Sequence, residues 1–210
     1  MQLTCENLTC SRGGRQVFSG LNFSLPGGEA LVVTGRNGAG KSSLLRMLAG
    51  LISISTGRLA LTGAEDDATL AEQSHYLGHL DAVKPSLSVG ENLRFWAKFL
   101  GERSGPIEPA LAAVDLVPLA DLPAGYLSAG QRRRLSIARL VAAPRPIWLL
   151  DEPTSALDVP SQKRLAELMA GHLAGGGMIV AAAHGPIGLE RARELKLGPE
   201  ILDQTSLDQT

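Results

Sequence analysis

Hydrophobic and polar residues alternate near the start of the chain and are then gathered into short apolar runs. Leu21, Phe23 and Leu25 are spaced by two, which is the period of a strand with one buried face. A Pro-Gly-Gly turn at residues 26–28 leads into a continuous apolar run over residues 30–33. The pattern predicts an antiparallel β part at the N-terminus, followed by a fully buried strand.

Strands and helices alternate in the rest of the pattern. A glycine-rich loop precedes a predicted helix over residues 42–50, and apolar strands are predicted over residues 147–150 and 178–183. A predicted helix over residues 160–172 and a triple-glycine turn at 175–177 separate the last two strands. This alternation is typical of α/β proteins with a mainly parallel sheet.

The segment over residues 86–143 has helical periodicity and few strand signals. It opens with Ser88 and Glu91, which have the spacing of a capping box at a helix N-terminus. We predict an inserted helical lobe over residues 86–143 and a core made of residues 1–85 and 144–200. Both belong to one predicted domain of 210 residues.

Composition fits an ordinary globular protein. Hydrophobic residues make up 44% and charged residues 20%, and the mean hydropathy is +0.08. The longest apolar run, residues 178–183, is far shorter than the ~20 residues needed to cross a bilayer. The net charge of −1 offers no general attraction to nucleic acid or anionic lipid. The N-terminus lacks a basic region followed by an apolar core, so we expect the chain to stay in the cytosol.

The two cysteines, Cys5 and Cys10, do not predict a zinc site. A third cysteine is missing, and the first histidine is His75. We expect both to be reduced thiols buried or half-buried in a strand.

Residues 35–42, GRNGAGKS, match the phosphate-loop pattern G-x-x-x-x-G-K-[ST] between a predicted strand and a predicted helix. Glycines let backbone N–H groups surround phosphate oxygens, and the helix adds its positive end. Lys41 is predicted to contact the β- and γ-phosphates, and the Ser42 hydroxyl to ligate Mg²⁺. The candidate nucleotide-binding residues here are Gly35, Arg36, Asn37, Gly38, Ala39, Gly40, Lys41, Ser42 and Ser43.

Two carboxylates follow the buried strand over residues 147–150. Asp151 occupies the place from which an acid holds Mg²⁺ in a phosphate-loop enzyme, and we assign it to the metal. Glu152, one residue further on, is the predicted general base that orients or deprotonates the water attacking the γ-phosphate.

A second helix N-terminus is predicted at residues 127–131, LSAGQ, where Ser128 and Gln131 form another capping box. Because one nucleotide already has its loop at residues 35–42, this second phosphate-binding surface is best explained by the nucleotide of another copy of the chain. The run Arg132–Arg134 does not predict nucleic-acid binding, because consecutive helix positions point in different directions.

These motifs together resemble those of the nucleotide-binding subunit of ATP-binding cassette (ABC) transporters, over nearly the whole chain and in the family's order. The resemblance implies a P-loop NTPase fold with a RecA-like sheet, and ATP and Mg²⁺ as ligands. It implies that residues 155–158, Asp158 included, contact the opposite subunit. It also implies that His184 contacts the γ-phosphate, so that Glu152, His184 and Lys41 form the catalytic set. The segment Ser128, Ala129, Gly130 and Gln131 is the family's signature.

Three positions depart from the family's pattern. Ala129 replaces a signature glycine, a small change that we expect binding to survive. Arg12 stands where an aromatic side chain normally stacks on adenine, and its planar guanidinium can stack instead. His79 stands where the family has a glutamine, and imidazole can ligate the metal or donate a hydrogen bond; a plain structural histidine is the alternative.

The YLGH stretch ending at His79 and the Arg-rich segment 191–198 resemble one subgroup, the haem-exporter ATPases of cytochrome c maturation. This resemblance implies a multispanning membrane permease subunit as partner and a peripheral location on the cytoplasmic face of the inner membrane. Haem would be handled by the complex and not by this chain, which lacks C-x-x-C-H.

Other functions remain open from the sequence. The closest is the ATPase of another small ABC exporter that carries a drug, lipid or lipoprotein. A kinase lacks LSAGQ, a DNA-repair ATPase needs a long coiled coil, and a binding module without hydrolysis does not need Glu152 and His184. A candidate docking segment for the membrane subunit is residues 79–95, with Leu80, Val83, Leu93, Phe95 and the adjoining Trp96 as contacts, although core packing explains these residues equally well.

Overall fold

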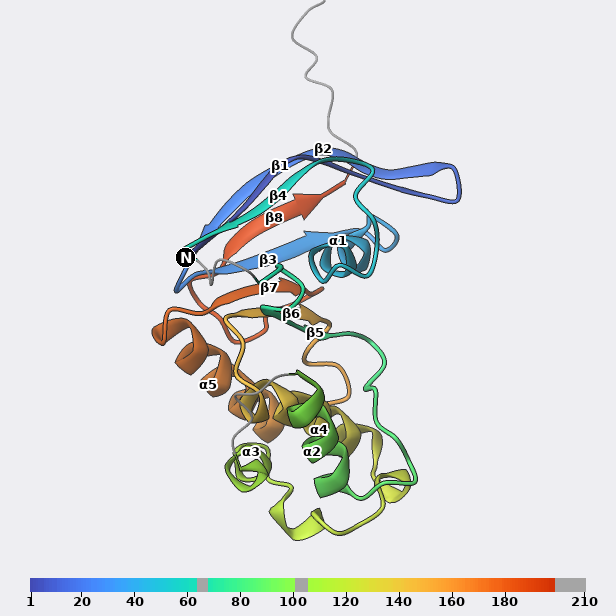
Figure 1. The fold of residues 1–210 in the computed structure, drawn as a ribbon, viewed down its shortest axis with the longest axis vertical. Coiled ribbons are helices and arrows are strands. Elements are labelled where there is room, and N and C mark those ends of the chain that lie inside the picture. Colours follow the sequence, from blue (N-terminus) through green and yellow to red (C-terminus); the bar gives the residue numbers. More distant parts are fainter. Residues whose placement is uncertain (64–67, 101–105, 199–210) are drawn as a thin grey trace, which may run out of the picture.

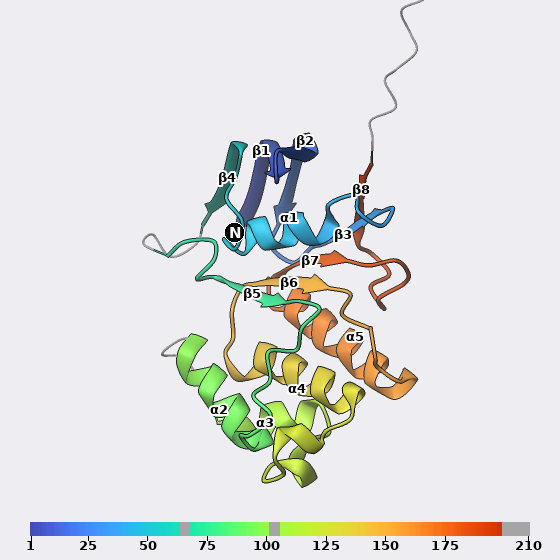
Figure 2. The ribbon, with the colours of Figure 1, turned by 90° about the vertical axis from the view of Figure 1, so that its right-hand side faces the viewer.

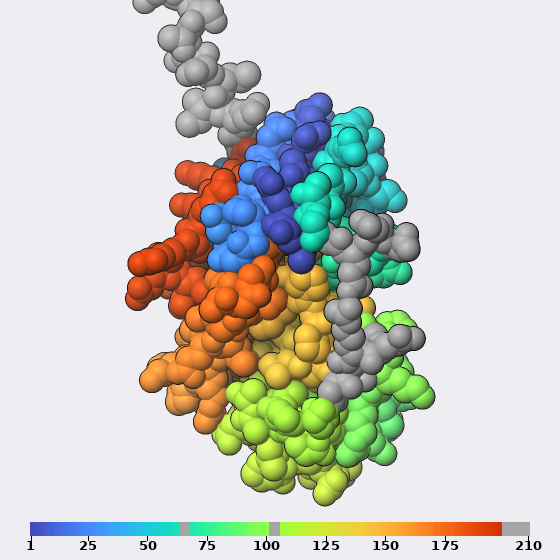
Figure 3. Space-filling view, turned by 60° about the vertical axis from the view of Figure 1, so that its left-hand side comes forward, coloured from blue at the N-terminus to red at the C-terminus, as the bar shows by residue number. Residues whose placement is uncertain are grey.

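The computed structural model of the chain describes residues 1–63, 68–100 and 106–198. Small parts of the predicted lobe (101–105) and of the predicted core (64–67 and 199–200), with the C-terminal end, lie outside these residues. Figure 1 shows an antiparallel sheet at one end, a second sheet in the middle, and a group of helices at the other end. The space-filling view in Figure 3 shows the N-terminal residues, in blue, toward one end of the molecule and the residues of the helical group, in green, at the other.

The N-terminal sheet is antiparallel, as the alternation at residues 21–25 predicts. Its strand order is β2-β1-β4, with β1 at Gln2–Arg12, β2 at Arg15–Pro26 and β4 at Thr56–Thr62. Cys5 and Cys10 are free, buried thiols on β1, as expected, and burial raises the pKa of Cys5 to about 11.

The middle sheet is parallel throughout its described pairings, which confirms the predicted mainly parallel α/β sheet. Its strands stand in the order β5-β6-β7-β3-β8. The bounds are Ser74–Leu77 for β5, Ile147–Asp151 for β6, Met178–Ala182 for β7, Ala30–Gly35 for β3 and Arg193–Leu197 for β8. Each residue of β6 and β7 is buried, in line with the apolar runs that predicted these strands.

Helices cover the two faces of this parallel sheet. Helix α1, Lys41–Leu48, lies on the face toward the antiparallel sheet, whereas α5, Val159–Ala174, lies on the opposite face (Figure 2). Beyond α5 lie α2 (Val89–Leu100), α3 (Ile107–Ala113) and α4 (Ala129–Ala142), with short 3-10 turns η1 (Val117–Leu119) and η2 (Ala124–Tyr126). In the part of the chain described, no helix is both long and apolar enough to cross a bilayer.

The parallel sheet separates two hydrophobic clusters. Along β6, Ile147 and Leu149 pack with α1 and the antiparallel sheet, while Trp148 and Leu150 pack with the helices on the other side. This alternation follows from the period of two in a strand. Each fully buried leucine or isoleucine contributes about 1.5–3 kcal/mol, so both clusters hold the sheet in place.

Candidate functional site

The glycine-rich loop between β3 and α1 requires glycine at particular positions. Gly35 has a φ of 142°, and a Cβ atom there would collide with the carbonyl oxygen of Leu197 on β8. Gly40 has a φ of 101°, and a Cβ atom would lie 2.6 Å from Cγ1 of Val17. The loop therefore fits between β8 and the β1-β2 hairpin only because these two positions lack side chains.

The N-terminus of α1 opens directly onto this loop. Its N-cap is Gly40, which has no side chain to accept a hydrogen bond from the first N–H groups. The first N–H groups of a helix have no partner within the helix, and they carry the positive end of the helix dipole. Together with the glycine loop, this arrangement suits an anionic phosphate group.

Lys41 is 8% exposed, and its ammonium group points back into the loop. Nζ donates to the carbonyl oxygen of Gly35 at 2.8 Å and to that of Arg36 at 3.3 Å. It also lies 3.3 Å from Nε2 of His184. The structure thus brings together Lys41 and His184, two of the residues predicted to form the catalytic set.

Ser42 and Asp151 meet at the base of α1. The Ser42 hydroxyl donates to Oδ1 of Asp151 at 3.0 Å, although the two residues are 109 positions apart. A hydroxyl and a carboxylate at this spacing are hard oxygen donors of the kind that Mg²⁺ prefers. The pair fits the predicted metal role.

Tyr76 on β5 also touches this carboxylate. Its hydroxyl donates to Oδ2 of Asp151 at 3.4 Å and accepts from Nε of Arg46 at 3.2 Å. Burial raises the pKa of the Tyr76 hydroxyl, so it remains a neutral donor, and its hydrogen bond raises the pKa of Arg46. His79, predicted as a third metal ligand, is exposed in the bend after β5; Tyr76 is the residue of this segment that reaches Asp151.

Glu152 and His184 face each other at the ends of β6 and β7. Nε2 of His184 lies 3.6 Å from Oε1 of Glu152, and both side chains keep access to solvent, at 54% and 32% exposure. Glu152 has a φ of 47°, an uncommon conformation for a residue other than glycine. A partly exposed carboxylate beside an imidazole is suited to hold and deprotonate a water molecule.

A cavity of about 810 Å³ borders the phosphate loop. It is lined by residues 15–22 of the hairpin, 36–39 of the loop and 196–198 at the end of β8. Arg15 lines this cavity, and Arg12 lies opposite Arg15 across the hairpin turn. Arg12, predicted to stack on the base, is exposed and is not among the lining residues.

The signature segment lies at the start of α4. Ser128 is the N-cap, its hydroxyl accepts from the backbone N–H of Gln131, and the Gln131 side chain accepts in return from the Ser128 N–H. The predicted capping box is therefore confirmed. Ser128 and Ala129 are exposed, whereas a Cβ atom on Gly130 would lie 2.9 Å from the carbonyl oxygen of Ala156.

Asp158 acts locally as a helix cap. Its carboxylate accepts from the backbone N–H of Ser161 at 3.0 Å at the start of α5, and this hydrogen bonding lowers the pKa of Asp158. The side chain is exposed, so the predicted contact with an opposite subunit stays a prediction.

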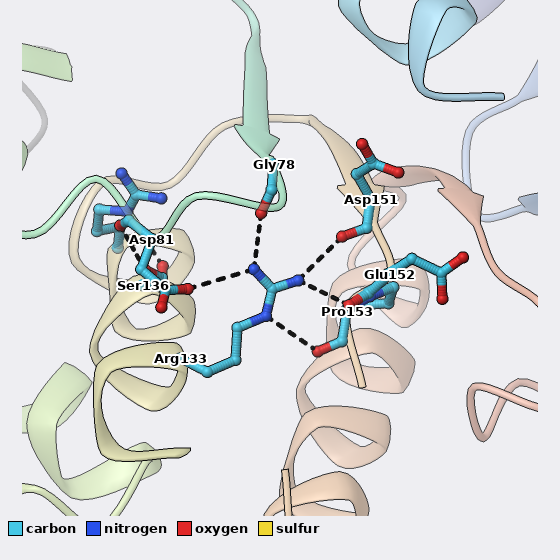
Figure 4. Close-up of polar contacts among 8 residues, drawn as sticks. Gly78, Asp81, Arg133, Ser136, Asp151, Glu152 and Pro153 are labelled. Carbon is cyan, nitrogen blue, oxygen red and sulfur yellow. Dashed lines mark hydrogen bonds and ion pairs between the residues drawn. The ribbon is translucent and has the colours of Figure 1, made fainter. Parts of the chain in front are cut away.

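The site contains residues that sequence reasoning missed. Tyr76, Arg46 and Arg15 touch or border the predicted site, and Arg133 lies beneath it (Figure 4). For Tyr76 the signal was its place next to the apolar end of a short strand, three residues before His79. Arg133 is the middle one of three consecutive arginines, and nothing in the sequence indicates which of the three is buried.

Comparison with known proteins agrees with this geometry. The sequence model described as "ABC transporter" matches residues 18–155. The chain is 60% identical over 198 residues to the Cytochrome c biogenesis ATP-binding export protein CcmA of Nitrobacter winogradskyi, covering 94% of this chain and 98% of that one. It is 59% identical, with the same coverage, to the protein of the same name from Rhodopseudomonas palustris.

Solved structures share the fold. A putative ABC transporter ATP-binding protein from Pyrococcus furiosus superposes with a TM-score of 0.81 at 21% identity, over 94% of this chain and 98% of that one. The ATP-binding subunit of another ABC transporter gives 0.82 at 24% identity, over 94% and 86%. The P-loop NTPase fold expected from the motifs is confirmed. By sequence and by fold, the chain belongs to the ABC transporter family.

Proposed function

We propose that this chain is the ATP-hydrolysing subunit of an ABC transporter. The observation that carries the proposal is the convergence of four side chains from three separate segments: Lys41, the neighbours Asp151 and Glu152, and His184. Lys41 and His184 are 3.3 Å apart, and His184 and Glu152 are 3.6 Å apart. A cation, an imidazole and a carboxylate at one point, beside a phosphate loop, are the groups that phosphoryl transfer to water needs.

Each residue has a proposed task. Backbone N–H groups of residues 35–43 and the ammonium of Lys41 hold the β- and γ-phosphates. Glu152 accepts a proton from the attacking water, whose oxygen bonds to the γ-phosphorus while the bond to the ADP oxygen breaks. His184 holds the γ-phosphate side of this arrangement. Ser42 and Asp151 would hold Mg²⁺, which neutralises phosphate charge when bound.

The active unit is proposed to be a dimer of two copies. The signature segment lies on α4, on the opposite side of the parallel sheet from α1, and its first residues, Ser128 and Ala129, are exposed (Figure 1). A capped helix start with exposed small residues is suited to meet a phosphate group bound elsewhere. Two ATP molecules would then lie between the phosphate loop of one copy and the signature segment of the other, with Arg12 and Asp158 near the shared interface.

The transported cargo is proposed from the relatives. Their name, Cytochrome c biogenesis ATP-binding export protein, places them in cytochrome c biogenesis and export, and they match this chain over nearly its full length. We therefore assign this chain to haem export and the release of a haem-loaded chaperone. Its partner would be a multispanning permease, at the cytoplasmic face of the inner membrane, with haem handled by the complex. Another small ABC exporter is the competing assignment.

A docking surface for the permease is proposed on segment 79–95 and the adjoining turn of α2. Leu80 is 82% exposed and Phe95 is 55% exposed, while Val83 and Trp96 are partly exposed and line a shared hollow. The prediction that Leu93 is a docking contact is wrong. Leu93 is fully buried in the helical core, because it occupies the inner face of α2. Phe99, 70% exposed and stacked on Phe95, joins the surface.

Deletion of the gene tests the cargo assignment. We expect periplasmic c-type cytochromes to lose covalent haem, detected by haem staining. Wild type should restore it and Glu152→Gln should not. Normal cytochromes in the deletion strain would remove the haem assignment and leave the ATPase assignment standing, because ATP hydrolysis by the purified chain is measured separately.

A further inference from the structure

Arg133 is a buried cation in the middle of the site region. It lies on α4, two residues after Gln131, and its side chain is only 2% exposed. Its neighbours on the helix do different things: Arg132 donates to the carbonyl of Leu127, and Arg134 donates to the carbonyls of Val114 and Asp115. Of the three arginines, Arg133 alone points toward the ends of β5 and β6 (Figure 4).

The guanidinium group of Arg133 uses all five of its N–H donors. Nη1 donates to the Gly78 carbonyl at 2.7 Å and to Oδ1 of Asp81 at 3.4 Å. Nη2 donates to the carbonyls of Asp151 at 2.9 Å and Glu152 at 2.8 Å. Nε donates to the carbonyl of Pro153 at 3.4 Å. A planar fork with five donors matches this set of acceptors, and neither lysine nor glutamine has enough donors in the right directions.

These acceptors belong to two separate chain segments. Gly78 and Asp81 follow β5, whereas residues 151–153 form the end of β6 and the turn after it. Arg133 therefore links the segment after β5, the end of β6 and helix α4 through one side chain. The close approach of Gly130 to the carbonyl of Ala156 holds the same helix against the turn after β6.

The contact with Glu152 concerns a residue in an uncommon conformation. Its φ of 47° is a left-handed value that costs of order 1–3 kcal/mol for a residue other than glycine. Three hydrogen bonds hold the backbone of Glu152: its N–H donates to the Ala182 carbonyl at 2.9 Å, and its carbonyl accepts from the Ser155 N–H at 3.1 Å and from Arg133 at 2.8 Å. The Ser155 bond is local to the turn, whereas the Arg133 bond is the one that ties this backbone to α4.

Stability alone does not explain a cation at this position. Burial lowers the pKa of Arg133, which reflects the cost of removing the charge from water. Well-packed apolar residues often stabilise a core as well as a buried ion pair does. The specific gain from arginine is the fixed geometry of the carbonyl groups that it binds.

We propose that Arg133 is a positioning residue that holds the backbone of Glu152 in its left-handed conformation and couples the general base to the signature helix. This inference rests on the proposed role of Glu152. It also links two proposed sites in one copy, since α4 begins with the segment that meets the nucleotide of the second copy.

The test compares Arg133→Met and Arg133→Lys with Arg134→Met in the full-length chain. Methionine has a similar side-chain volume but no hydrogen-bond donors. Lysine keeps the positive charge but lacks the planar guanidinium with its five N–H donors. Arg134→Met is the matched control, because Arg134 also donates to two carbonyls and a carboxylate, all within the helical part of the chain. The measurements are kcat, KM, the Kd for MgATP and the thermal unfolding midpoint.

In both Arg133 variants kcat should fall by about tenfold to a hundredfold, because a small displacement of the Glu152 carboxylate from the attacking water slows the reaction by that much. Their Kd for ATP should change by less than about twofold, because the phosphate loop is untouched. Arg134→Met should lower the unfolding midpoint and leave kcat within about twofold of wild type. If Arg133→Met fails to fold, the kcat of Arg133→Lys tests the inference.

Three outcomes would overturn the inference: an unchanged kcat in the folded Arg133 variant, a parallel loss of ATP affinity, or an equal loss of kcat in Arg134→Met. Glu152→Gln is assayed beside them. If it keeps full turnover, the proposed function of Glu152 fails. If it loses turnover while the Arg133 variants do not, only the role of Arg133 fails.

Discussion

Nε2 of His184 lies 3.6 Å from Oε1 of Glu152, although the two residues come from the ends of different strands. Parallel neighbours β6 and β7 present their carboxyl ends at one edge of the sheet, so residues just after them meet. The pair gives one end of the sheet a carboxylate and an imidazole on the solvent side.

Glu152→Gln removes the proposed proton acceptor and keeps the size of the side chain. Turnover should fall by about 10²–10⁴, the usual contribution of a general base. ATP should still bind, so ATP-bound dimers should accumulate and elute earlier in size-exclusion chromatography with MgATP. Glu167→Gln, an exposed carboxylate on α5, is the control. Full ATPase activity in Glu152→Gln would remove this residue from its assigned role.

Lys41→Ala removes a buried ammonium group that donates to the Gly35 and Arg36 carbonyls. Hydrogen bonds to a charged group contribute about 1.5–3 kcal/mol, so the Kd for ATP should rise by about tenfold to a hundredfold. Equilibrium binding of a fluorescent ATP analogue measures the change. Lys163→Ala, on the exposed side of α5, should bind ATP as the wild type does. Equal affinity in both variants would contradict the phosphate contact.

Gly35→Ala should destabilise the chain, because Gly35 combines a φ of 142° with a carbonyl oxygen of Leu197 in the space of the new methyl group. We expect a loss of about 2 kcal/mol or more in the free energy of unfolding. Gly171→Ala, inside α5 with no neighbour within 4 Å of the new atom, should instead gain about 0.5–1 kcal/mol. Urea unfolding followed by circular dichroism compares the two, and the same sign of change in both would contradict the steric argument.

His75 makes stability depend on pH. Burial lowers its pKa from 6.5 to about 4, and its ring bonds the Ala143 carbonyl. Between these pH values the unfolded chain binds more protons than the folded chain, so the free energy of unfolding falls as pH drops from 6.5 toward 4. The contribution of His75 is roughly 3 kcal/mol at most.

His75→Gln keeps a donor for the Ala143 carbonyl and removes the titration, so urea unfolding should show a shallower fall over this pH range. His172, whose pKa burial also lowers, leaves a smaller slope in the same direction. His79→Gln, a histidine substitution at an exposed position, is the matched control. A slope in His75→Gln equal to that of the wild type would show that this residue is not the source.

Leu80→Ser combined with Phe95→Ser tests the proposed docking surface. Both side chains are largely exposed, so the double variant should fold normally and lose co-purification with the membrane subunit. Tyr126→Ser, 79% exposed elsewhere on the helical part, is the control. Intact co-purification with the double variant would mean that the permease docks elsewhere.

Local signals in the sequence predicted much of this fold. The capping boxes at Ser88 and Ser128 depend on residues three positions apart, so they can be found without knowing the fold. The apolar runs of β6 and β7 are equally plain, because both faces of these strands are buried. The phosphate loop is recognisable because its chemistry requires its spacing.

Features that depend on long-range pairing could not be predicted. Strand β8 is short and mostly charged, and its parallel pairing with β3 fixes it more than its own pattern does. Arg15 borders the cavity because of the register of the first hairpin. Arg133 is the buried arginine because of the way α4 packs beneath the sheet. Neither fact is encoded within a few neighbouring residues.

The two hydrophobic clusters also determine which part of this protein intrinsic tryptophan fluorescence can report on. Both tryptophans of the chain lie on the helical side of the parallel sheet: Trp148 packs in that cluster against His172, and Trp96 sits on α2 beneath the Arg139 guanidinium. The phosphate-loop side contains none. Intrinsic tryptophan fluorescence is therefore a one-sided probe. In a single copy, any change in emission caused by nucleotide at the loop must be transmitted through the sheet to the helices, whereas in the proposed dimer the signature segment of the second copy offers a direct route.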